Sequence, residues 1–138
     1  MIIDFHTHVF PSYIRDGREV LTSKDDTLRA LYSNESDRMI SAEELVSTMA
    51  GSGGDLSVVM GIGWTDVELG RISNDYLIES VNRFPTKLMG FCSVNPLWGS
   101  VALDEIERCA DAGLVGIGEL HPESQAFDLT DISLMTPI

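Results

Sequence analysis

The sequence predicts an α/β fold in which parallel strands alternate with helices. Four short apolar runs have the length and composition of strands that are buried on both faces: residues 2–5, 56–62, 88–94 and 114–120. Helical patterns of about 10–15 residues separate the later runs, which is typical of βα units in a parallel sheet. Polar residues follow several of the runs, at the positions where parallel βα folds place their functional groups.

The first strand and the segment after it differ in pattern. Residues 2–5 are predicted to form a short buried strand, because β-branched Ile2 and Ile3 favour extended backbone. Residues 10–40 show no strong periodicity, and they are far longer than the roughly 2–6 residues that usually connect a strand to a helix. We therefore expect a long loop there, either a functional lid or a flexible segment.

The first regular helix is predicted to begin at Ser41. Ser41 and Glu44 have the spacing of a capping box, and apolar Leu45 and Met49 follow on one face. Glycines at 51–54 end this helix before the strand at 56–62. We expect Ser73 to cap the next helix and Pro85 to end it, before the strand at 88–94.

The last part of the chain repeats the same alternation. Ser100 is predicted to begin a third helix, and Gly113 stands where a left-handed C-terminal cap belongs. The strand at 114–120 follows, and Asp131 resembles the cap of a fourth helix that the sequence barely begins. Right-handed crossovers would place the four strands side by side in chain order, in a single partial domain over residues 1–138.

Composition and charge exclude several classes of function. The chain is 43% hydrophobic with a net charge of −13, which argues against nucleic acid or an anionic membrane as a partner, since both require basic patches. No apolar stretch approaches the roughly 20 residues that span a bilayer. The two cysteines are too few for a disulfide framework. We expect a cytoplasmic protein acting on a small molecule.

The most informative motif is the His6-Thr7-His8 sequence at the end of the first strand. Alternate side chains of a strand share a face, so the two imidazoles would point into one concavity, as half of a metal site. Two imidazoles suit a zinc or an iron site, and zinc is the divalent metal that we expect there. Glu119, at the end of the fourth strand, is the candidate for a third ligand.

Other strand ends and the long loop supply candidate substrate contacts. Trp64, Asn95 and His121 follow the second, third and fourth strands. Five of the nine basic residues fall between positions 15 and 38, in the loop that leaves the first strand directly after the histidines. Of these, Arg15 and Arg18 lie nearest the site in sequence, and such guanidinium groups would favour a carboxylate substrate.

Two motifs resemble a known superfamily. Residues 3–8, Ile-Asp-Phe-His-Thr-His, resemble the first-strand signature of metal-dependent amidohydrolases. Residues 116–129, Gly-Ile-Gly-Glu-Leu-His-Pro-Glu-Ser-Gln-Ala-Phe-Asp-Leu, are similar to the fourth-strand region of the amidohydrolase-related branch. That branch includes aminocarboxymuconate-semialdehyde-decarboxylase-like enzymes, which act on aromatic and unsaturated acids. The similarity extends through 63–66, 74–76 and 94–96.

The resemblance implies the N-terminal half of a TIM barrel, a (β/α)₈ fold of about 250 residues. It also implies ligand histidines on the fifth and sixth strands and a general-base aspartate on the eighth, and none of these positions exists in this sequence. We therefore expect a truncated product, a fragment, or a half-barrel that pairs with a second copy or a complementing C-terminal half.

The resemblance implies a metal-dependent hydrolase that uses metal-activated water, with non-oxidative decarboxylation as the alternative on the same scaffold. A second enzyme class, the polymerase-and-histidinol-phosphatase-type phosphoesterases, also begins with a His-x-His strand. That class requires further histidines soon after the first pair, whereas the only other histidine is His121. The alternative outside enzymology is an inactive half-barrel that oligomerises through its open edge and uncovered apolar face.

Overall fold

A computed structural model describes all residues, 1–138, and contains one four-stranded parallel sheet in the order β1-β2-β3-β4. The strands are β1 (Ile3–His8), β2 (Leu56–Met60), β3 (Leu88–Cys92) and β4 (Gly116–Ile117). The predicted α/β class and strand order are therefore confirmed. β1 is longer than predicted and runs through both histidines, whereas β4 is only two residues long.

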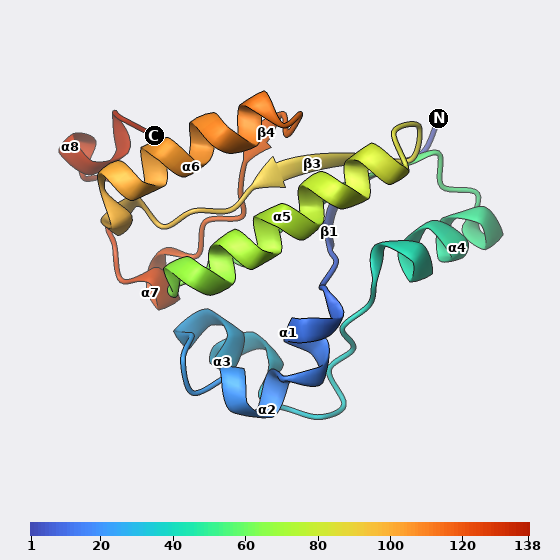
Figure 1. Ribbon diagram of the computed structural model, residues 1–138, viewed down its shortest axis with the longest axis horizontal. Coiled ribbons are helices and arrows are strands. Elements are labelled where there is room, and N and C mark those ends of the chain that lie inside the picture. Colours follow the sequence, from blue (N-terminus) through green and yellow to red (C-terminus); the bar gives the residue numbers. More distant parts are fainter.

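The longer helices pack on one side of this sheet. They are α4 (Ala42–Ser52), α5 (Val67–Arg83) and α6 (Ser100–Asp111). Figure 1 shows α5 and α6 side by side, with the sheet behind them. The prediction that Ser73 caps the second helix is wrong. Asp66 is the cap, since its carboxylate accepts a hydrogen bond from the Leu69 amide at 2.9 Å, and Ser73 lies buried inside α5.

Short helical turns complete the C-terminal part: η1 (Pro96–Trp98), α7 (Pro122–Gln125) and α8 (Ile132–Met135). The Asp131 carboxylate accepts hydrogen bonds from the Ser133 and Leu134 amides, so the predicted cap of the last helix is confirmed. The short helix α7 was not predicted from the sequence; it is separated from β4 by residues 118–121 and carries the buried Gln125. No helix of the structure combines the length and the apolar character needed to cross a membrane.

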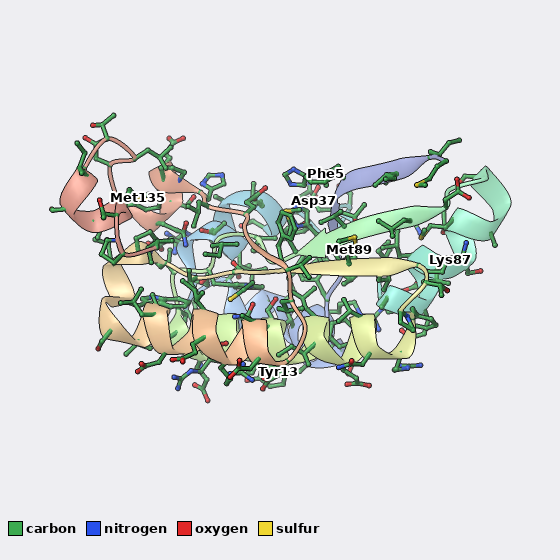
Figure 2. All side chains as sticks on the ribbon, turned by 90° about the horizontal axis from the view of Figure 1, so that it is seen from above. Phe5, Tyr13, Asp37, Lys87, Met89 and Met135 are labelled. Carbon is green, nitrogen blue, oxygen red and sulfur yellow. The ribbon has the colours of Figure 1, made fainter.

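The two faces of the sheet differ in how well they are covered. The larger core cluster, which includes Val59, Leu77, Leu88 and Cys109, packs between the strands and the helices. On the opposite side, Phe5 stacks edge-on against Phe91 and remains 64% exposed. Figure 2 shows Phe5 on the side away from α5 and α6. The expected uncovered apolar face is therefore present.

The segment over residues 10–40 is largely helical rather than a featureless loop. It contains α1 (Ser12–Asp16), α2 (Arg18–Leu21) and α3 (Asp26–Tyr32), which gather at one end of the molecule (Figure 1). Their buried side chains join residues that follow β2 in a second core cluster: Phe10, Ile14, Leu21, Leu28, Ile62, Trp64 and Leu69. Helices this short are unstable alone, so tertiary packing holds them.

A buried polar network joins α5 to α6. The Glu105 carboxylate is 1% exposed, and it accepts hydrogen bonds from the Asn74 amide at 2.9 Å and from two nitrogens of Arg108 at 2.7 and 2.9 Å. Burial alone would raise the pKa of Glu105, but the hydrogen bonds from Arg108 and Asn74 outweigh it and hold the pKa below its ordinary value.

This network predicts a pH-dependent stability. Because the pKa of Glu105 is lower in the folded than in the unfolded chain, ionised Glu105 stabilises the fold near neutral pH, and this contribution is lost as the pH falls through its folded pKa. Glu105→Gln should lower the free energy of unfolding at pH 7 by about 2 kcal/mol. Urea unfolding should show this difference from wild type shrinking towards pH 3. An equal difference at both pH values would contradict the assignment.

Candidate metal centre

Three potential ligand atoms converge at the carboxyl ends of the strands. The Nε2 atoms of His6 and His8 lie 3.1 Å apart, and a carboxylate oxygen of Glu119 lies 2.7 Å from the first and 3.8 Å from the second. All three atoms lie within 4.8 Å of one another. Ligand atoms of a single divalent ion are about 3 Å apart, because each lies roughly 2 Å from the ion. Both the spacing and the donor types therefore fit a divalent metal.

His8 is the better oriented of the two histidines. Its Nδ1 lies 3.1 Å from the carbonyl oxygen of Met60 on the neighbouring strand, so Nδ1 carries the ring proton and the Nε2 lone pair faces Glu119. Burial lowers the pKa of His8, against the opposing effects of the Met60 carbonyl and Glu119. The ring is therefore neutral at pH 7, as a metal ligand must be. His6 is more open, with its side chain 59% exposed.

A bulge shapes the end of β1. The register with β2 shifts between Asp4 and Thr7, so the strand is not regular across this stretch. The Asp4 carboxylate is exposed and lies 3.4 Å from the His6 amide nitrogen, outside the cluster of ligand atoms. Thr7 anchors the strand on the other side of the bulge, since its hydroxyl donates to the Val58 carbonyl at 2.8 Å.

A pocket of about 590 Å³ opens beside this cluster. It is lined by residues from β1, the end of α3, the segment after it, and the chain following β4: His8, Leu31, Tyr32, Asp37, Arg38, Glu119, Leu120, His121, Pro122 and Glu123. Of the predicted substrate contacts, His121 lines this pocket. The lining carries three carboxylates and one arginine, so its net charge is negative and favours a cationic ligand. A bound metal ion would offset this charge and allow an anionic ligand to bind.

Two predicted contact residues lie behind the pocket rather than on its wall. Trp64 is fully buried in the second core cluster, because α1, α3 and α5 cover the strand end that it follows. Asn95 is 4% exposed, and its carboxamide caps η1 by accepting from the Leu97 amide at 2.9 Å. Both residues support the strand ends from within.

The two predicted arginines also lie elsewhere. Arg15 is paired with Glu44 at 3.1 Å, and Arg18 donates to the backbone carbonyls of Asp37 and Glu35. They line a separate hollow of about 450 Å³ beside α1 and α2. With residues 10–40 folded into helices, these two side chains line this hollow and not the pocket beside His8.

The arginine that does line the pocket is Arg38, from the same basic segment. Sequence distance from the histidines favoured Arg15 and Arg18, but the chain reverses through α3 and returns position 38 to the site. Tyr32 is a second pocket residue that the sequence analysis missed. Burial, followed by the charges of Glu119 and Asp37, raises the pKa of Tyr32, so its hydroxyl stays protonated and can donate a hydrogen bond.

Comparison with known proteins rests on structure alone. No family model and no curated protein matches the sequence. A solved structure of 5-carboxyvanillate decarboxylase from Novosphingobium aromaticivorans, with bound manganese and 3-methoxy-4-hydroxy-5-nitrobenzoic acid, is similar over 100% of this chain, at 19% identity and a TM-score of 0.79. This chain therefore shares its fold with about half of that decarboxylase's chain.

Other solved structures share this half-barrel. A structure of amidohydrolase II is 17% identical over 85% of this chain, with a TM-score of 0.63. Dihydroxybenzoic acid decarboxylase from Polaromonas sp. JS666, with bound manganese and 2-nitroresorcinol, is 23% identical over 84%, with a TM-score of 0.53. This chain covers 46% of the length of the 5-carboxyvanillate decarboxylase chain, 39% of the amidohydrolase II chain and 37% of the dihydroxybenzoic acid decarboxylase chain. The predicted resemblance is thus confirmed at the level of the fold.

Proposed function

We propose that this chain supplies the metal-binding half of an enzyme that decarboxylates a small carboxylate-bearing substrate without an oxidant. The convergence of His6, His8 and Glu119 beside a pocket is the observation that carries this proposal. From the sequence, hydrolysis was the first expectation and decarboxylation the second. Decarboxylation comes first here because several structures with this half-barrel are decarboxylases, including one with a TM-score of 0.79.

His6, His8 and Glu119 would hold the divalent metal. A bound ion of this kind polarises substrate oxygens and offsets negative charge, which would make the acidic pocket receptive to a carboxylate. Manganese is the metal in three of the similar structures, so both manganese and the zinc predicted from the ligand types are candidates. In the pocket, the Arg38 guanidinium would pair with the substrate carboxylate and the Tyr32 hydroxyl would donate to it.

The proposed activity belongs to a complete barrel. This half-barrel provides three ligands on one side of the pocket, and further strands would close the open sheet face and supply the proton donor. The remainder of a longer chain or a second chain would provide those strands. Hydrolysis is the second candidate, because an amidohydrolase II structure shares the half-barrel with a TM-score of 0.63.

Product analysis separates the two reactions. The complete barrel, formed by this chain together with the strands that close it, is incubated with Mn²⁺ and with two panels of compounds, one of hydroxylated benzoates and one of lactones. We expect CO₂ release from a benzoate, lost in Glu119→Gln and retained in Asp16→Asn, a control that removes a carboxylate outside the pocket. Ring opening of a lactone without CO₂ would establish hydrolysis instead. A manganese-loaded complete barrel that forms neither product would contradict both.

A further inference from the structure

Glu119 reaches the histidines from the far edge of the sheet. β1 and β4 are separated by β2 and β3, and neighbouring strands are about 4.8 Å apart, so the two edges are far from hydrogen-bonding distance. Nevertheless, the Glu119 carboxylate lies 2.7 Å from His6. The backbone after β4 must therefore cross the ends of the two middle strands.

Backbone hydrogen bonds trace this crossing. The amide of Gly118 donates to the Cys92 carbonyl on β3 at 2.8 Å, and the next amide, of Glu119, donates to the Gly61 carbonyl after β2 at 3.3 Å. Two residues later the backbone lies against Gly63. An added Cβ at Gly63 would come within 2.8–2.9 Å of the Cβ and amide nitrogen of His121. Gly63 also has a φ of +73°, which a larger residue adopts with strain.

The side chain of Gln125 holds this crossing segment in place through hydrogen bonds. It is 1% exposed, and its Nε2 donates to the carbonyls of Trp64 and Val94, each at 3.0 Å, after β2 and β3. Its Oε1 accepts from the His121 amide at 2.8 Å, and its own amide donates back to the His121 carbonyl. One buried carboxamide thus forms hydrogen bonds with the chain after three different strands. Removing any one of these side-chain bonds would leave a backbone carbonyl or amide without its partner.

The same turn fixes the ring of His121. The Ser124 amide lies 3.3 Å from His121 Nδ1 and donates to it, so the neutral ring carries its proton on Nε2. The turn has only one residue between His121 and Glu119, so whatever holds the His121 backbone also limits where the Glu119 carboxylate can lie.

We propose that Gln125 is the positioning residue of the metal centre: packed against Gly63, it holds the chain after β4 so that Glu119 reaches His6 and His8. This inference rests on the proposed function for what the metal centre does. The clamp, by which we mean the side-chain hydrogen bonds of Gln125 and its packing against Gly63, is formed by residues of this chain alone. Gln125 does not touch the ligand atoms. It acts through the His121 backbone.

Two variants test the clamp in different ways. Gln125→Leu keeps the approximate volume and removes the three side-chain hydrogen bonds. Gly63→Ala keeps the Gln125 side chain but places a Cβ about 2.8 Å from the His121 Cβ and 3.2 Å from the Gln125 Oε1, so His121 and Gln125 must shift. Met49→Ala, which removes a core side chain of α4, is the control for general loss of stability. Two quantities are measured: the affinity for Mn²⁺ by calorimetry, and the ring ¹⁵N shifts of His121 in the metal-free protein by NMR.

We expect both clamp variants to bind Mn²⁺ roughly 10- to 100-fold more weakly, with His121 shifts that depart from the Nε2–H form, and the control to leave both unchanged. Unaltered His121 shifts in both clamp variants would overturn the proposal, as would altered shifts with Mn²⁺ affinity within twofold of wild type. If the wild-type protein binds no Mn²⁺, the proposed function fails, and the His121 shifts alone decide for or against the clamp.

Discussion

Replacing His8 with alanine should weaken Mn²⁺ binding roughly a hundredfold or more. His8 is the less exposed histidine of the pair, with its side chain 20% exposed against 59% for His6, and the Met60 carbonyl fixes its Nε2 towards Glu119. A ligand held in this way loses little freedom when metal binds, so its removal costs more than the removal of the exposed His6. Calorimetric titration of both variants should place them in that order, with His8→Ala the weaker binder.

Glu123→Gln is the matched control for this result. Glu123 lines the same pocket and carries the same charge as Glu119, but it lies outside the cluster of ligand atoms. Its replacement should change Mn²⁺ affinity by about threefold at most, since its charge acts only through solvent at a distance. If Glu123→Gln weakens binding as strongly as His8→Ala, the pocket attracts cations by its overall charge and the three-ligand site is wrong.

The largest effect on stability is expected from Asp25→Ala. The Asp25 side chain is fully buried and accepts four hydrogen bonds, from the Leu28 amide, from the amide and hydroxyl of Thr65, and from the Asp66 amide. It caps α3 and also ties that helix to the turn before α5. Alanine would leave one buried and two partly buried amides without a partner, so the free energy of unfolding should fall by about 3 kcal/mol or more.

The neighbouring carboxylate gives a direct comparison. Asp26 is exposed and pairs with Arg29 on the same helix, an arrangement that contributes little in water. Asp26→Ala should therefore cost about 1 kcal/mol or less in urea unfolding. Equal losses in the free energy of unfolding for Asp25→Ala and Asp26→Ala would show that Asp25 does not anchor α3 to the turn before α5.

The sequence predicted the part of the site that depends on strand geometry. Alternation along β1 places His6 and His8 together, and the rule that functional groups gather at strand ends selected Glu119. Hydrophobic runs and the Ser41 capping box likewise predicted the sheet and α4. These features are local, so a single sequence carries enough information to find them.

What the sequence did not predict depends on tertiary contacts. The helices of residues 10–40 are four to seven residues long, too short to show a period, and they exist because Asp25 and the second core cluster hold them. The positions of Arg15, Arg18 and Arg38 follow from that packing. Gln125 belongs to no recognisable sequence motif. Its role depends on hydrogen bonds to three segments that follow different strands, and only the folded chain brings these segments together.

An anomalous difference map from Mn²⁺-soaked crystals tests the central claim most directly. The account predicts a single strong peak about 2 Å from the Nε2 atoms of His6 and His8 and from a carboxylate oxygen of Glu119. The peak should disappear in crystals of Glu119→Gln prepared in the same way. A peak elsewhere in the pocket, or no peak at these three residues at saturating Mn²⁺, would contradict the account.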